Sequence, residues 1–161
     1  MKKGGAQEII IRGIATREGC VLANKSRGGK TGVPYAALPG GHLDPGESCR
    51  AAVAREFEEE LGVTIDVGEL CFVSESIYPG RTPLDSPRHE LVLYFRVTLR
   101  DELNEDQGRI ASPEASKNFA WIPLEQMDEV NLLPVSIRAF LWGTDPFEQD
   151  ELYSFDDSTQ A

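Results

Sequence analysis

The chain has 161 residues, of which 40% are hydrophobic and 27% charged, and its formal net charge is −11 at pH 7. This length and composition predict one soluble globular domain, and the acidic balance argues against a broad nucleic-acid surface, which needs a basic face. No apolar run is long enough to span a membrane. The three cysteines lack the spacing of a metal site, so we expect a cytoplasmic protein with reduced thiols.

A polar, flexible start is expected at residues 1–7, and the domain itself at residues 8–142. Apolar or alternating runs bounded by turn residues predict the following strands: 8–16, 20–24, 35–38, 63–67, 69–78, 89–99 and 118–122. The first two are expected to form a hairpin. The loop that follows contains Arg27 and Lys30, two cations that are candidates for contacting substrate phosphates, although a solvated loop is an equal alternative.

The segment from Gly41 to Val63 predicts a turn followed by a helix with one buried stripe. The stripe residues recur every four positions: Val53, Phe57 and Leu61. Gly62 stands where a glycine commonly follows a helix end. The N-cap is either Asp44 or Ser48, and the sequence does not decide between them.

Four carboxylates gather in the last turns of this helix: Glu56, Glu58, Glu59 and Glu60. Acids at a helix C-terminus face the negative end of the dipole, at roughly 0.3–1 kcal/mol each, and like charges on one face repel. A solvated acidic face is the alternative, but a divalent cation removes the conflict, because carboxylates are ligands that Mg²⁺ and Mn²⁺ prefer. The paired glycines Gly40 and Gly41 allow a backbone carbonyl to turn toward such an ion.

Beyond the helix, the strand at 89–99 carries Glu90 and Tyr94 on its more polar face. We expect these two side chains to contact substrate, with a solvent-facing surface as the alternative. A final helix is predicted from Pro134 to Trp142. The acidic tail, residues 143–161, is expected to be disordered.

The segment around the acidic helix resembles the signature of the Nudix (MutT-like) hydrolases. Nine specified positions match: Gly41, Glu47, Arg55, Glu56, Phe57, Glu59, Glu60, Gly62 and Val63. Phe57 is aromatic where an aliphatic residue is more usual. The resemblance implies an α/β fold, the Nudix α/β/α sandwich with a mixed β-sheet, and Mg²⁺ or Mn²⁺ as cofactor.

The resemblance also implies roles for individual residues. The cation would be held by three carboxylates and one carbonyl: Glu56, Glu59, Glu60 and Gly40. The general base is left open between Glu56, Glu60 and Glu114, the last from a downstream loop. Glu47 and Arg55 are expected to pair and hold the turn against the helix. Arg55 is also a catalytic candidate. Gly41 and Gly62 are expected to have structural roles.

The implied reaction is metal-dependent hydrolysis of a phosphoanhydride in a nucleoside diphosphate linked to a group X. In such families the residue at about this position indicates X: a Pro for ADP-ribose and a Tyr for dinucleoside polyphosphates. Tyr78 and Pro79 stand side by side there, so X stays open, with a preference for ADP-ribose-like or nucleotide-sugar substrates. The alternative is a non-catalytic, nucleotide-sensing module, although such proteins typically lose signature acids and none is lost here. The expected partner is a small nucleotide substrate. No membrane partner is expected, and a homodimer is left open.

Overall fold

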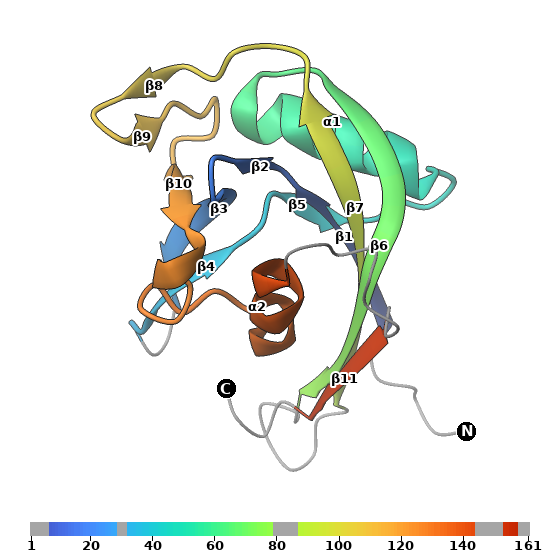
Figure 1. Cartoon of the computed structure of the whole chain (residues 1–161). Helices are drawn as coiled ribbons and strands as arrows, with labels where there is room; N and C mark the ends of the chain where they lie inside the picture. Colours follow the sequence, from blue (N-terminus) through green and yellow to red (C-terminus); the bar gives the residue numbers. More distant parts are fainter. Residues whose placement is uncertain (1–6, 29–31, 79–86, 144–152, 158–161) are drawn as a thin grey trace.

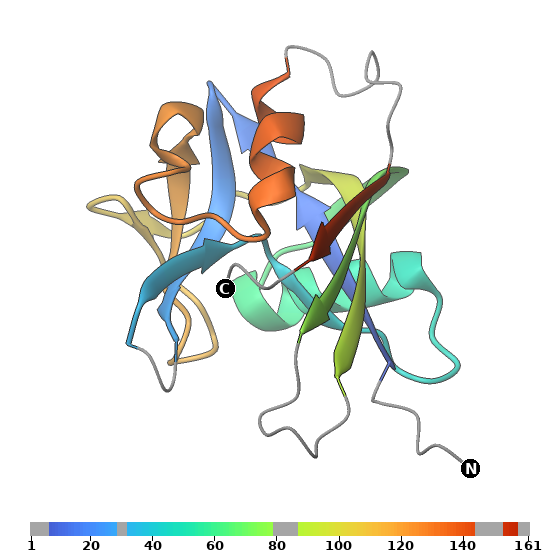
Figure 2. The same cartoon turned by 90° about the horizontal axis from the view of Figure 1, so that it is seen from below.

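The computed structural model describes residues 7–28, 32–78, 87–143 and 153–157. Figure 1 shows two β-sheets, with helix α1 (Cys49–Leu61) and helix α2 (Val135–Trp142) on opposite faces of the first one. Seen from below in Figure 2, the sheets splay apart and α2 lies between them at one end. The predicted α/β/α sandwich is therefore confirmed, with the difference that the strands divide between two sheets.

The first sheet has the strand order β11-β6-β7-β1-β5. Its strands, in chain order, are β1 (Gln7–Ile14), β5 (Gly40–His42), β6 (Ile65–Tyr78), β7 (Arg88–Leu99) and β11 (Tyr153–Asp157). The pairs β1–β7 and β6–β11 are parallel and the other pairs antiparallel, so this sheet is mixed. Because Arg12 of β1 pairs with Gly40 of the edge strand β5, the glycine turn is fixed against β1 at this edge of the sheet.

The second sheet is antiparallel and carries the remaining strands: β2 (Thr16–Arg17), β3 (Cys20–Arg27), β4 (Pro34–Ala37), β8 (Glu105–Asp106), β9 (Arg109–Ile110) and β10 (Phe119–Pro123). A single 3-10 turn, η1 (Leu124–Gln126), follows β10. In the part of the chain that the structure describes, no helix is both long and apolar enough to cross a membrane.

The two helices cover opposite faces of the first sheet, and each face has its own hydrophobic core. On one face Val53 and Phe57 of α1 are fully buried, which confirms the predicted stripe. A Cβ atom on Gly13 would lie 2.4 Å from Cε2 of Phe57, so a glycine in β1 makes room for the aromatic residue that stands in the signature. On the other face, Phe140 of α2 packs against Phe72.

Both ends of α1 are capped. The Ser48 hydroxyl accepts a hydrogen bond from the Ala51 N–H at 3.2 Å, so Ser48, not Asp44, is the N-cap. Gly62 has a φ of 67° and donates its N–H to the Glu58 carbonyl, the left-handed cap predicted from the sequence. This cap ends the helix one turn after Glu58 and leaves the acidic residues in the final turns.

Two predictions about strands need correction. The expected hairpin is present only at its tip, where Thr16 and Arg17 of β2 pair with β3; β1, the rest of the predicted first strand, joins the first sheet. The strands predicted at 63–67 and 69–78 are one strand, β6, with register shifts around Leu70. The reason is that a bulge lets a strand continue past a Gly that reads as a break.

Two further segments, for which the sequence predicted no strand, contain strands. The polar stretch before residue 117 includes the β8–β9 hairpin, turned at Gln107 and Gly108, both with positive φ. Within the tail that was expected to be disordered, Tyr153–Asp157 form β11, which pairs with the edge of β6. Its Tyr153-Ser154-Phe155 alternation was an available strand signal, outweighed in the prediction by the acidic composition.

Candidate active site

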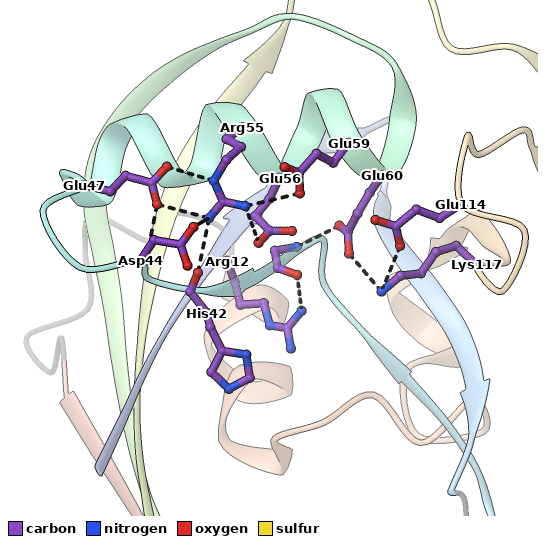
Figure 3. Close-up of polar contacts among 11 residues, drawn as sticks. Arg12, His42, Asp44, Glu47, Arg55, Glu56, Glu59, Glu60, Glu114 and Lys117 are labelled. Atoms are coloured by element: carbon purple, nitrogen blue, oxygen red, sulfur yellow. Dashed lines mark hydrogen bonds and ion pairs between the residues drawn. The ribbon is translucent and has the colours of Figure 1, made fainter. Parts of the chain in front are cut away.

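The acidic end of α1 lies over the glycine turn of β5, and Figure 3 shows Glu56 and Glu60 one helical turn apart above it. The Gly40 N–H donates a hydrogen bond to Oε2 of Glu60 at 3.0 Å. A Cβ atom on Gly41 would lie 2.3 Å from Oε1 of Glu56. The turn therefore accepts both carboxylates only because its residues lack side chains.

Gly40 itself must be glycine. Its φ is +146°, and a Cβ atom there would lie 2.0 Å from the Ile11 carbonyl oxygen. Its own carbonyl accepts a hydrogen bond from Nη1 of Arg12 at 3.1 Å, and the same nitrogen donates to the Leu38 carbonyl at 2.8 Å. Arg12 thus fixes the carbonyl that the signature implies as a ligand, a role that sequence reasoning missed.

Arg55 connects the acids of the helix to the turn before it (Figure 3). Its Nε and Nη2 bind the two oxygens of Glu47 at 2.8 and 3.0 Å. Its Nη1 binds Glu56 at 3.0 Å and Glu59 at 3.2 Å, and Nη2 also donates to the His42 carbonyl. The hydrogen bonds from Arg55 lower the pKa of Glu47. The predicted pairing of Glu47 with Arg55 is present in the structure, and it extends into the acidic cluster.

Glu60 is the most enclosed of these acids, with 3% of its side chain exposed. Burial raises its pKa, against the opposing effect of Lys117. The Lys117 ammonium lies 3.0 Å from Oε1 of Glu60 and 3.9 Å from Oε2 of Glu114. The structure therefore brings the downstream candidate Glu114 to the edge of the site, together with a lysine that the sequence analysis did not single out.

The donor set fits a hard divalent cation. Glu60 accepts the Gly40 N–H, Glu56 lies against Gly41, and Arg55 joins Glu56 to the half-exposed Glu59, so three carboxylates lie around the glycine turn. Within the described ranges, no three acid, His or Cys side chains converge as a ready-made metal site. The acids are turned toward cations instead, so metal binding requires them to exchange contacts with Arg55 and Lys117.

The structure gives different outcomes for the residues predicted to contact substrate. Tyr94 is 1% exposed and packs against Phe72, so its prediction as a substrate contact is wrong: it is a core residue. Glu90 is half-buried, burial raises its pKa, and Arg88 binds it at 2.8 Å. Arg27 is exposed at the end of β3, and Lys30 lies outside the described residues, so both stay predictions.

A cavity of about 1120 Å³ opens elsewhere, between the end of β7, the β8–β9 hairpin and α2. Its lining includes Arg17, Trp121 and Phe140 and none of the acids of α1. We do not place the chemistry there, because the carboxylates able to hold a cation lie at the glycine turn.

Gly41 provides a direct test of the turn. Replacing Gly41 by Ala is expected to lower metal-dependent activity about 10- to 100-fold, because the new methyl group must push away the Glu56 carboxylate, and misplacing a reacting group by about 1 Å has costs of that order. Its φ lies outside the left-handed region, and only the end of a flexible side chain is displaced. Thermal melting should therefore change little, and a large loss of stability would contradict this explanation.

Known proteins share the domain and the fold of this chain. The family model described as NUDIX domain matches residues 7–142. A structure titled as a MutT NUDIX hydrolase, from Burkholderia pseudomallei, superimposes with a TM-score of 0.61 at 21% identity, covering 87% of this chain and 99% of that one. A MutT protein structure from Bacillus halodurans gives a TM-score of 0.63 at 19% identity, over 92% and 88% of the two chains.

Curated relatives share parts of the sequence. The m7GpppN-mRNA hydrolase NUDT17 of Bos taurus is 33% identical over 91 residues, 52% of this chain and 30% of that protein. An RNA pyrophosphohydrolase of Erythrobacter litoralis is 37% identical over 71 residues, 44% of this chain and 42% of that protein. The nucleoside triphosphatase NudI of Salmonella newport is 24% identical over 123 residues, 75% and 85% of the two chains. Two of these matches thus span less than half of the relative.

Proposed function

Because the chain belongs to the Nudix family of hydrolases, as its signature indicated, we propose that it hydrolyses a phosphoanhydride bond of a small nucleotide. The observation that supports this proposal is that Glu56 and Glu60 both lie over the glycine turn, where Glu60 accepts the Gly40 N–H and Arg55 links Glu56 to Glu47. Nudix hydrolases generally use a divalent metal such as Mg²⁺. Here the residues that would hold it are Glu56, Glu59, Glu60 and the Gly40 carbonyl.

A bound divalent cation would neutralise the phosphate charge and lower the pKa of a water ligand. The protein's own contribution is position and charge. Arg12 holds the Gly40 carbonyl, and the Gly40 N–H holds Glu60. Arg55 keeps Glu56 and Glu59 on one side of the helix. The base that accepts the water proton is one of three carboxylates: Glu56, Glu60 or Glu114.

The relatives' names identify substrates as different as an mRNA cap, RNA and nucleoside triphosphates. What these molecules share is a chain of phosphates attached to a nucleoside, which agrees with the reaction proposed for this protein. From the sequence we favour nucleoside diphosphates linked to X, with ADP-ribose-like molecules and nucleotide sugars as first candidates. We propose Mg²⁺ or Mn²⁺ as the metal, because both prefer oxygen ligands such as these carboxylates.

The test is a turnover screen of the purified protein with Mg²⁺ or Mn²⁺, with and without EDTA. The panel contains ADP-ribose, nucleotide sugars, dinucleoside polyphosphates, nucleoside triphosphates, a cap dinucleotide and a 5′-triphosphorylated oligonucleotide. We expect one class to be hydrolysed far faster than the others, and only with metal. Nucleotide binding without turnover of any member would instead support the alternative, a nucleotide-sensing module in which the acids stay paired with Arg55 and Lys117.

A further inference from the structure

Lys117 reaches the acidic site from the segment between β9 and β10, on the side opposite Arg55 (Figure 3). Its side chain is 28% exposed, and its Nζ lies 3.0 Å from Oε1 of the buried Glu60. The same Nζ lies 3.9 Å from Oε2 of Glu114, whose side chain is 41% exposed. One ammonium group thus lies between an enclosed carboxylate and an accessible one.

The backbone around Lys117 is tied to the end of α1. The Ser112 hydroxyl donates a hydrogen bond to the Glu60 carbonyl at 2.6 Å and accepts one from the Glu114 N–H at 3.1 Å. The Lys117 N–H in turn donates to the Glu114 carbonyl at 3.0 Å. A change of partner by Lys117 therefore requires a rotation of its flexible side chain and no movement of the segment.

Both oxygens of Glu60 are occupied. Oε2 accepts the Gly40 N–H at 3.0 Å, and Oε1 binds Lys117. A divalent cation that binds Glu60 must take or share Oε1, and its charge would repel an ammonium group that stayed there. The cation and Lys117 consequently compete for one oxygen.

We propose that Lys117 is a positioning residue that holds Glu60 when no metal is bound and passes to Glu114 when a divalent cation binds. This inference rests on the proposed metal site. Glu114 is the natural acceptor, because its carboxylate already lies beside the same Nζ and is open to solvent. Lys117 thereby lowers the intrinsic affinity of the site for metal, and Glu114 restores part of it by drawing Lys117 away.

The test is the Mn²⁺ affinity of the purified protein without substrate, measured by isothermal titration calorimetry. The set contains wild type, Lys117→Met, Glu114→Gln and the double variant. We expect Lys117→Met to bind Mn²⁺ at least about fivefold more tightly, a usual size for coupling between two binding events. Glu114→Gln should bind more weakly, because Lys117 then stays on Glu60. In the double variant the Glu114 change should have no further effect.

Lys25→Met is the matched control, because Lys25 is an exposed lysine on β3 and its loss changes the net charge equally. It should leave Mn²⁺ affinity unchanged, and a gain as large as that of Lys117→Met would reduce the effect to general electrostatics. Equal or weaker binding by Lys117→Met overturns the proposal. The proposal is also overturned if the loss of Mn²⁺ affinity in Glu114→Gln persists in the double variant, since Glu114 would then be a metal ligand. If Lys117→Met does not fold, Lys117→Gln replaces it in the same set, alone and combined with Glu114→Gln.

The outcomes separate this inference from the proposed function. A wild-type protein that binds no Mn²⁺ would contradict both the proposed function and the role of Lys117. Binding with the expected order of affinities but no turnover of any nucleotide removes the proposed reaction and leaves the role of Lys117 intact. Turnover of a nucleotide with unchanged Mn²⁺ affinity in Lys117→Met removes the inference alone.

Discussion

Replacing Glu60 by Gln is expected to lower kcat/KM at least about 1000-fold, which corresponds to about 4 kcal/mol of lost transition-state stabilisation. Gln has nearly the same shape and can still accept the Gly40 N–H, so the glycine turn should stay in place. What disappears is the negative charge that a divalent cation needs at the enclosed end of the site. The measurement is steady-state kinetics on the substrate found in the screen, with Mg²⁺ varied.

Glu58→Gln is the matched control, because Glu58 lies on the same helix with an exposed side chain. That variant should keep its activity within about twofold, since surface changes away from such features have small effects. Glu60→Gln should stay folded, because ionised Glu60 is disfavoured by burial, which raises its pKa. A Glu60→Gln enzyme that retained a tenth of the wild-type activity would exclude Glu60 from the metal site.

The parts of the site that the sequence predicted are those built from local spacing. Glu56 and Glu60 are one helical turn apart, so any helix places them on one face. The glycine cap at Gly62 and the pairing of Arg55 with Glu47 likewise depend on neighbours within the signature. A sequence pattern contains this information because the geometry of a helix is regular.

The parts that were missed depend on contacts between distant segments. Arg12 binds the Gly40 carbonyl 28 residues away, and Lys117 reaches Glu60 from beyond β9. Neighbouring residues do not specify either role, because each role exists only once β1 pairs with β5 or the later segment packs against α1. The one sequence signal for Arg12 was its place directly after three isoleucines of the same strand.

The errors in the fold have the same origin. The first strand was predicted to pair with its neighbour in sequence, but β1 lies between β5 and β7 in the first sheet, parallel to β7. The alternation that placed Tyr94 on a polar face was real, yet α2 covers that face and buries it in a core with Phe140. Periodicity identifies which residues share a face, and only the packing of other elements decides what that face meets.

Replacing Arg55 by Lys is expected to lower kcat/KM about 100-fold, the upper end of what loss of a group that orients ligands costs. Lys keeps the charge but cannot reproduce the planar fork, which binds both oxygens of Glu47 and reaches Glu56 with another nitrogen. The unfolding free energy should fall by about 1–3 kcal/mol, because partly buried carboxylates lose hydrogen bonds. Kinetics and denaturant unfolding measure the two effects.

Arg50→Lys serves as the matched control, because Arg50 lies on the same helix and donates to the Val67 carbonyl outside the acidic site. It should leave kcat/KM within about twofold. Glu47→Gln distinguishes a link through Arg55 from two separate effects. If Arg55 acts by tying the turn to Glu56, the double variant should lose little more activity than Arg55→Lys alone, since residues in one network are not additive. If the losses of activity are fully additive, or if Arg55→Lys lowers stability and leaves activity intact, Arg55 stabilises the fold but does not orient the acids.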